Sequence, residues 1–456
     1  MHNTYWEIKR NFVSAYFLVD VIGFLQAVPL FGQVLAPHRY ARVAKRVDER
    51  IVPPVNTTLT VTRLEDHAGS HDEHAPLGFT TIEQADRVET MLRNLGLTAQ
   101  FARLIVFTGH GSSSLNNPHE SAHDCGACGG KHGGASARAF AAMANRQEVR
   151  AVLRERGIDI PGDTWFVGSQ HNTCSELYTF FDVQDIPATH QDEWRRLVAD
   201  LDEARARSAQ ERCRRFASAP KDVTPEQSLR HIEGRAVDLS QVRPEWGHAT
   251  NAFAVVGRRA VTQGLFLDRR PFLISYDPTQ DPDGTILERV VLSVGPVGAG
   301  INLEYYFSTV DNQKFGADTK VPHNVYGLVG VMEGAMSDLR TGLPKQMVEV
   351  HEPMRLQLVI EASTAHLGEI YGRQPAVQQL LDNAWVHLIA IDPDTGAMNL
   401  FVPGVGFVPW DKPLTPLPVV QSSFEWYRGK TDFLPPALIV QHDFHHVGHA
   451  ADLETA

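Results

Sequence analysis

Histidine and cysteine side chains are concentrated in one stretch of the sequence, between residues 104 and 134. An apolar run over Leu104–Phe107 predicts a short buried strand, and His110 follows at its exit. The Gly-rich loop that comes next contains His119, His123, Cys125, Cys128 and His132. Imidazole and thiolate are ligands that Zn²⁺ prefers, and a Gly-rich loop can wrap around an ion. The stretch therefore predicts a metal site.

His110 and Cys125 are the strongest ligand candidates in this stretch. A side chain at the carboxyl edge of a sheet is rigidly aimed, and the loop between His110 and Cys125 is long enough to fold back over the strand end. Cys125 and Cys128 could instead form a CxxC half-site, but no second CxxC or CxxH is present to complete a structural zinc site. The alternative without metal is a pair of small buried residues in a glycine turn.

Other chemistries fit the motifs less well. The segment from Gly109 to Ser114 lacks the Lys and the spacing of a P-loop, and its serines are not in a GxSxG elbow. His171 and Cys174 could form a nucleophilic pair, but no third partner is evident. We expect the His-bearing segment 66–76 to be a solvated loop and the His-rich C-terminus to be a solvated tail.

Composition excludes several classes of protein. The chain has 456 residues, 43% of them hydrophobic, and a net charge of -12, which is typical of a soluble globular protein. No basic block or nucleic-acid-binding motif is present, so we expect no nucleic acid partner. Four cysteines in so long a chain do not indicate a disulfide framework, which favours a reducing cytosol. The first residues do not have the pattern of a secretory signal.

The segment 11–36 is apolar and long enough to span a bilayer, and its single charged residue is Asp20. Asp20 opposes a transmembrane span because a carboxylate within the bilayer is costly, and Pro29 would interrupt a spanning helix. We therefore expect a buried core helix or a membrane-docking hairpin here, with peripheral contact to a membrane partner.

Strand, loop and helix signals alternate up to about residue 216, which predicts an α/β sheet with functional groups at its carboxyl edge. The elements expected there are helices over 39–50, 80–95, 134–156 and 191–216, and strands over 59–64, 104–107 and 164–167, the last ending in a polar loop that contains His171. Farther on we expect strands over 273–276, 286–294 and 354–361 and a helix over 376–383. The expected division is 1–65 (apolar helical segment and linker), 66–245 (zinc-site α/β region) and 246–456 (α+β region).

Long blocks of the sequence resemble the DabA family, the large soluble subunits of bacterial Dab inorganic-carbon transporters. The blocks are GHGSSSLNNPHESAHDCGACGG (109–130), HNTCSE (171–176), FLISYDPTQDPDG (272–284), INLEYYFSTVDNQKFG (301–316), KVPHNVYGLVGVMEGAMSDLRTGLP (320–344) and HEPMRLQLVIEAS (351–363). The resemblance implies a β-carbonic-anhydrase-like sheet with flanking helices that holds one zinc ion. The family's ligands are a Cys-x-Asp pair from an earlier strand, then a His and a Cys that match His110 and Cys125.

The resemblance also implies a function and a location. The family's proposed role is to hydrate CO2 to bicarbonate in one direction, driven by an ion gradient. The gradient acts through an integral membrane partner that resembles the proton-pumping subunits of complex I, a DabB-like protein. The implied location is the cytoplasmic face of the cell inner membrane, held peripherally.

The chain departs from the family pattern in one respect. No cysteine precedes Cys125, so the Cys-x-Asp pair has no match. We expect the chain to be the C-terminal portion of a family protein, as a fragment, a truncated product or one piece of a split subunit with a separate N-terminal half. The zinc site is then incomplete in this chain alone, which leaves open whether the chain is an enzyme. The alternative function is a non-catalytic assembly module that binds the membrane partner or the N-terminal half.

Overall fold

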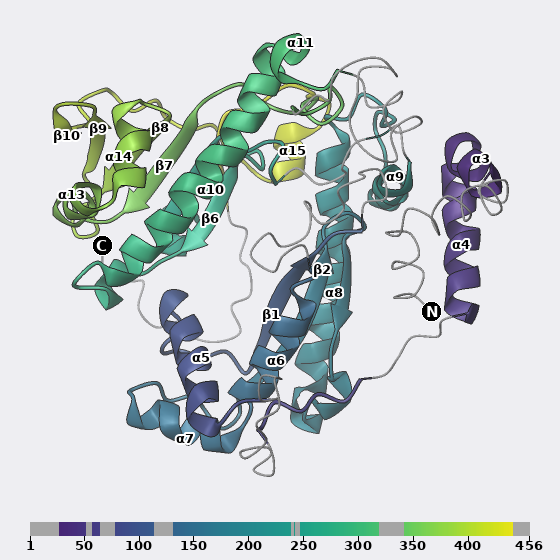
Figure 1. The fold of residues 1–456 in the computed structure, drawn as a ribbon, viewed down its shortest axis with the longest axis horizontal. Coiled ribbons are helices and arrows are strands. Elements are labelled where there is room, and N and C mark those ends of the chain that lie inside the picture. Colours follow the sequence, from purple (N-terminus) through teal and green to yellow (C-terminus); the bar gives the residue numbers. More distant parts are fainter. Residues whose placement is uncertain are drawn as a thin grey trace, which may run out of the picture.

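The computed structural model describes residues 27–51, 57–63, 78–113, 131–238, 241, 247–318 and 342–440. Across these residues the strands form three sheets, in the orders β1-β2-β3, β10-β9-β8-β7-β4-β6 and β11-β12-β5. Helices pack around the β1-β2-β3 sheet and around the six-stranded sheet (Figure 1). The protein is therefore a mixed α/β structure, as the sequence predicts. The likeness to β-carbonic anhydrase and the division at residues 65 and 245 stay predictions.

The first sheet contains His110, the residue of the predicted metal site that the structure describes on a strand. Strands β1 (Leu104–Gly111) and β2 (Trp165–Asn172) are parallel, and β3 (Leu177–Phe180) returns antiparallel to β2. The helices around it are α5 (Thr81–Asn94), α6 (Gly134–Ala144) and α7 (Gln147–Glu155). Phe140 of α6 stacks on Phe107 with ring centroids 4.2 Å apart, so α6 covers one face of β1. Thr80 caps α5 with a capping box, which confirms the predicted helix start.

Three predictions in this region are wrong in detail. The segment after Val167 is not a loop, because β2 continues to Asn172 and a tight turn then leads into β3. The single helix expected over 134–156 is two helices, broken at Asn145. The Asn145 side chain donates to the Phe166 carbonyl and accepts from the Phe166 N–H, at 2.8 and 2.9 Å, so it pairs with β2. The strand expected over 59–64 is only a bridge between Thr62 and Phe79.

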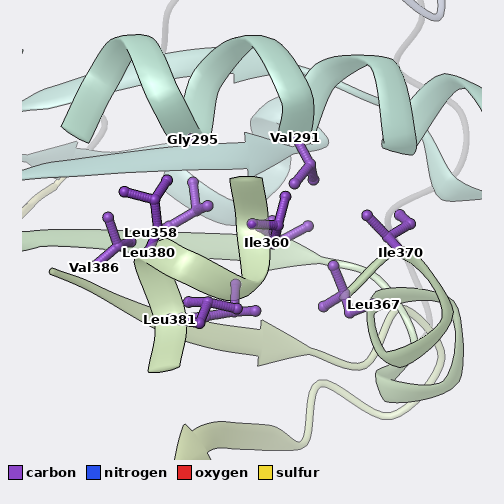
Figure 2. Close-up of a pocket in the computed structure, with 11 residues that line it drawn as sticks. Val291, Gly295, Leu358, Ile360, Leu367, Ile370, Leu380, Leu381 and Val386 are labelled. Carbon is purple, nitrogen blue, oxygen red and sulfur yellow. The ribbon is translucent and has the colours of Figure 1, made fainter. Parts of the chain in front are cut away.

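The second sheet forms a separate core. Its strands are β4 (Phe253–Gly257), β6 (Pro271–Ser275), β7 (Leu356–Glu361), β8 (Val386–Ile391), β9 (Met398–Val402) and β10 (Gly406–Pro409), of which the first four run parallel. Helices α10 (Thr285–Val310), α13 (Thr364–Arg373) and α14 (Pro375–Asp382) pack on it. Figure 2 shows a small cavity in this core, lined by aliphatic side chains such as Leu358, Ile360 and Leu381. Its lining residues are all aliphatic apart from Gly295 and offer no polar side chain, so it is a packing void.

The strand expected over 286–294 is wrong, because this segment belongs to helix α10. The Asp281 carboxylate accepts the N–H groups of Ile286 and Leu287 at 2.9 and 2.8 Å, and so satisfies the start of the helix. Within the described part of the chain, α10 is the one helix long and apolar enough to cross a membrane, judged by length and composition alone. Its buried stripe, which includes Leu287, Val291 and Gly295, packs on the sheet.

The remaining elements connect these regions. They are α3 (Ala27–Leu35), α4 (Pro37–Ile51), α8 (Gln191–Cys213), α9 (Pro225–Val237), α11 (Asn312–Phe315), α15 (Ser423–Tyr427), β5 (Leu265–Phe266), β11 (Val419–Val420), β12 (Ala437–Ile439) and the 3-10 turns η4 (Val183–Asp185), η5 (Ala188–His190), η6 (Arg259–Thr262) and η7 (Pro278–Gln280). The helices expected over 39–50, 191–216 and 376–383 are confirmed. Helix α3 has no buried residue, so the described end of segment 11–36 is not a core helix.

Candidate functional site

His110 and His171 lie side by side at the carboxyl edge of the first sheet. The two residues are Cα partners in the parallel ladder of β1 and β2. Because side chains alternate along a strand, both project from the same face, opposite α6. The preceding pair on this face, Thr108 and Ser169, is joined by a 2.7 Å hydrogen bond between the two hydroxyls. The predicted strand is therefore confirmed, but it is longer than expected: β1 runs to Gly111, so His110 is its penultimate residue and does not follow the strand.

The backbone beside His110 is held by a close approach of two glycines. The Gly133 N–H donates to the His110 carbonyl at 2.6 Å. A Cβ on Gly109 would lie 2.2 Å from the Gly133 carbonyl carbon, so only glycine fits there. Gly133 directly precedes α6, and the segment 114–130 that contains Cys125 connects β1 to this point. The chain on both sides of that segment is therefore anchored next to His110.

The metal ligands predicted in the loop cannot be placed. His119, His123, Cys125 and Cys128 all lie outside the described residues. His132 is described, and its Nδ1 lies 2.9 Å from Gln170 Nε2. Among the residues that the structure describes, no three His, Cys, Asp or Glu side chains form a group that could hold a metal ion. His110 Nε2 lies 3.1 Å from the Thr173 hydroxyl oxygen, and the role of His110 and Cys125 as zinc ligands stays a prediction.

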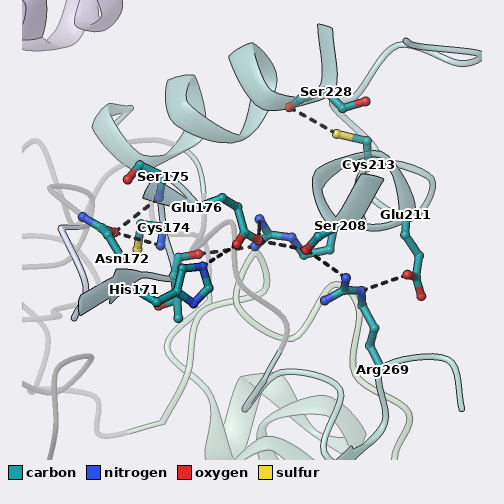
Figure 3. Close-up of polar contacts among 12 residues, drawn as sticks. His171, Asn172, Cys174, Ser175, Glu176, Ser208, Glu211, Cys213, Ser228 and Arg269 are labelled. Carbon is teal, nitrogen blue, oxygen red and sulfur yellow. Dashed lines mark hydrogen bonds and ion pairs between the residues drawn. The ribbon is translucent and has the colours of Figure 1, made fainter. Parts of the chain in front are cut away.

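The Glu176 carboxylate holds the ring of His171 in place (Figure 3). His171 Nε2 lies 2.7 Å from Glu176 Oε2, and Tyr178 stacks against the face of the imidazole ring at 4.5 Å between centroids. The other carboxylate oxygen, Oε1, accepts from Ser208 and pairs with the Arg212 guanidinium. Histidines that bind metals are often oriented by a carboxylate in this way. Within the described residues, His171 Nδ1 has no hydrogen-bond partner.

The charges behind His171 are buried and mutually compensated. Burial raises the pKa of the Glu176 carboxyl, but the Arg212 charge and the His171 hydrogen bond outweigh burial and hold that pKa at about 2. Burial lowers the pKa of Arg212, whose side chain is 2% exposed, while Glu176 raises it. Glu176 also has a left-handed backbone with φ of 60°, which is costly for a residue with a Cβ. The fold keeps this carboxylate ionised and fixed.

Sequence reasoning missed Glu176 and Arg212. The helix that contains Arg212 was expected to be mostly solvated on its outer face, and Glu176 was only one of several polar residues in a predicted loop. One signal was present. Ala209 and Cys213 lie three residues before and one residue after Arg212, and both are buried on the same stripe of α8. An arginine within an apolar stripe indicates a buried partner for its charge.

The nucleophile suggested by His171 and Cys174 is not supported. Cys174 is fully buried, with its Sγ 3.1 Å from the Ser112 hydroxyl. His171 Nε2 is directed to Glu176 instead. A thiol without access to solvent cannot attack a substrate from outside, so Cys174 is a structural residue.

Two other polar sites in the fold consist of side chains that already pair with one another. A cleft of about 280 Å³ lies beside α6, and at its wall Arg138 donates to both Asp182 oxygens and to Thr57. At the carboxyl edge of the second sheet, Glu361 accepts from the backbone and side chain of Arg258. These groups already satisfy one another, so neither place equals the His110 edge as a candidate site.

Comparison with known proteins decides the family. The family model described as "Probable inorganic carbon transporter subunit DabA" matches residues 1–386. The chain belongs to the DabA family. A DabA protein of Methylococcus capsulatus is 55% identical over 433 residues, which cover 95% of this chain and 40% of that protein. A second, from Sorangium cellulosum, is 55% identical over 94% of this chain and 42% of its own length.

The DabA likeness extends to more distant relatives. A DabA protein of Azotobacter vinelandii is 39% identical over 94% of this chain and 50% of that protein. Each of these three proteins is named a probable inorganic carbon transporter subunit. This chain spans half or less of the length of each. No solved structure matches it.

Proposed function

We propose that this chain is the zinc-binding C-terminal part of an inorganic carbon transporter subunit that acts on CO2 and bicarbonate. The observation that carries the proposal is the position of His110, at a sheet edge in a chain of the DabA family, with the Cys125 segment anchored on both sides of it. In this proposal His110 and Cys125 supply two zinc ligands. The remaining ligands come from a Cys-x-Asp pair outside this chain.

The residues of this chain have distinct tasks in the proposal. When bound, zinc would lower the pKa of its water, so that hydroxide would be available near neutral pH to attack CO2 and give bicarbonate. His110 holds its imidazole at the strand end, where the ladder with β2 fixes its direction. Glu176 and Tyr178 hold His171 beside it, so the edge presents two oriented imidazoles rather than one. A buried carboxylate and guanidinium behind them keep the support rigid.

The proposed partner is an integral membrane subunit, DabB-like, that couples hydration to an ion gradient. The names of the relatives include the word subunit, which supports a partner in a complex. We place the chain peripherally at the cytoplasmic face of the inner membrane. We expect no nucleic acid partner, because the net charge is -12 and the sequence contains no nucleic-acid-binding motif.

The second candidate function is a non-catalytic assembly module. It is supported by the departure of the sequence from the family pattern, in which the Cys-x-Asp pair has no match in this chain. On this hypothesis the chain binds the membrane subunit or an N-terminal half and has no metal of its own.

Zinc analysis of ligand variants separates the two functions. In the complete protein, with the N-terminal half present, we expect His110→Ala and Cys125→Ser each to remove stoichiometric zinc. The matched control Cys128→Ser should retain most of it. Equal losses in the three variants would indicate a CxxC site instead. Unchanged zinc in both His110→Ala and Cys125→Ser would favour the assembly module.

A further inference from the structure

Helices α3 and α4 form a hairpin with an unusually apolar surface. The exposed fractions of Val28 and Phe31 in α3 are 74% and 61%, and those of Val43 and Ile51 in α4 are 57% and 71%. In Figure 1 the hairpin lies at the margin of the molecule, away from the sheets. Helix α4 packs on α3 and, near its start, on α9, where His38 lies against Gly234. Most of the length of α4 is therefore open to a partner.

Helix α4 is apolar on one side and basic on the other. Tyr40, Val43, Val47 and Ile51 are spaced by three and four residues, which places them on one stripe. The basic residues Arg39, Arg42, Lys45, Arg46 and Arg50 follow the other side and its border. With Asp48 and Glu49, residues 37–51 have five basic and two acidic side chains, a net +3 in a chain whose net charge is -12.

The cations of α4 are available to an external anion. Within the described residues, no ion pair involves any of the five. The one side-chain contact among them is a hydrogen bond from Arg42 Nε to the His38 carbonyl. By contrast, four of the five arginines on the long helix α8 are paired with acidic residues, as Arg207 is with Glu203. The positive charge of α4 is therefore not neutralised within the fold.

We propose that the α3–α4 hairpin binds the surface of an anionic lipid bilayer. The proposal rests on the proposed function as a transporter subunit at a membrane. A helix with an aliphatic stripe bordered by Arg and Lys lies in the interface of a bilayer, with the stripe among the acyl chains and the cations at the phosphates. Tyr40, at the start of the stripe, lies against Gly32 of α3. The exposed remainder, Val43, Val47 and Ile51, has no hydrogen-bonding side-chain group, as a hydrocarbon surface requires.

Charge selects this orientation. An anionic bilayer repels the rest of the acidic chain and attracts the net positive α4, so the hairpin is the part that approaches. In the sequence before α3, residues 11–26 have a single charged side chain, Asp20. An apolar stripe with basic residues spread along its border favours lipid as the partner. A protein partner would instead offer acidic groups in fixed positions.

Vesicle flotation of the full chain tests the proposal, without zinc and without a membrane subunit. We expect the chain to float with vesicles of phosphatidylcholine that contain phosphatidylglycerol, and to float much less with phosphatidylcholine alone. Arg42→Gln combined with Arg46→Gln should weaken binding by on the order of tenfold or more, and high salt should do the same. Val43→Asp combined with Val47→Asp should abolish it.

The matched controls change the same residue types elsewhere. Val405→Asp replaces another exposed valine, and Arg195→Gln with Arg207→Gln removes two exposed arginines from α8, so both should float like the parent chain. No flotation, equal flotation with neutral vesicles, or capture only by a membrane protein would overturn the proposal. Because zinc content is measured separately, any of these results leaves the zinc experiment to decide the proposed function.

Discussion

His110 and His171 occupy the same register position on two parallel strands, and the Glu176 carboxylate fixes the second ring through a 2.7 Å contact. The edge of the sheet is thus organised before any ligand arrives. The residues that organise it lie far apart in the sequence, since Arg212 on α8 supports Glu176 in the β2–β3 turn. Four predictions follow from the buried groups, the glycine contact and the incomplete ligand set.

The first prediction concerns the isolated 456-residue chain. We expect it neither to hold zinc tightly nor to hydrate CO2, because two ligands leave about half of a tetrahedral sphere to water. Equilibrium dialysis against zinc and stopped-flow hydration measure the two properties. Stoichiometric zinc in the isolated chain would contradict the prediction and would mean that residues within it, such as His123 or His171, complete the site.

The second prediction concerns the buried pair of Glu176 and Arg212. Glu176→Gln leaves the Arg212 guanidinium without its ionised partner. We therefore expect the free energy of unfolding, measured by urea denaturation, to fall by about 3–5 kcal/mol. Glu203→Gln on the same helix α8 is the control, because its pair with Arg207 is exposed and should be worth less than about 1 kcal/mol. A similar loss in both variants would show that burial does not distinguish the pairs.

The third prediction concerns pH. Burial lowers the pKa of His351 to about 4, and its Nδ1–H donates to the Ala249 carbonyl at 3.0 Å. The imidazole of His351 becomes protonated more readily in the unfolded chain, where its pKa is near the ordinary 6.5. The contribution of the neutral, buried ring to stability is therefore complete above about pH 6.5 and is lost as the pH falls toward 4.

The control for this pH effect is the variant His351→Gln, which keeps the other titrating groups. We expect the stability difference between the parent chain and the variant to shift by about 3 kcal/mol over this pH range, against the parent at low pH. Urea unfolding at several pH values gives the difference directly. A difference that is independent of pH would mean that His351 is not kept neutral by the fold.

The fourth prediction concerns Gly109. A methyl group there would meet the Gly133 backbone at 2.2 Å, so Gly109→Ala should destabilise the protein by more than about 2 kcal/mol and reduce zinc in the complete protein. Gly300→Ala, on an open side of helix α10, meets no atom and should stabilise by about 1 kcal/mol. If Gly109→Ala were as well tolerated as Gly300→Ala, the loop would not depend on this contact.

Local signals in the sequence predicted some elements correctly. Thr80 and Glu83 form the capping box of α5, and the apolar run before His110 forms a strand, because both depend on neighbours within a few residues. Helix α10 was mistaken for a strand in part, since its run of valines has high β propensity. The Asp281 cap and packing on the sheet override that propensity.

Partners distant in the sequence limited what could be predicted about the site. The place of His110 depends on its own strand, but the pairing with His171 depends on the register between β1 and β2. The Glu176–Arg212 contact joins a turn and a helix that no local pattern relates. Cys125 lies outside the described residues, so its role stays a prediction.

The glycine contact at His110 also sets how the proposed zinc ligands find each other. Lys131 is two residues from Gly133, and Cys125 is six positions before Lys131 in the chain, so even an extended chain keeps Cys125 within roughly 20 Å of Lys131. A tether of this length gives the thiolate a millimolar effective concentration at the strand end. In the proposed site, an ion on the His110 imidazole would therefore meet Cys125 by chelation and not by an independent encounter.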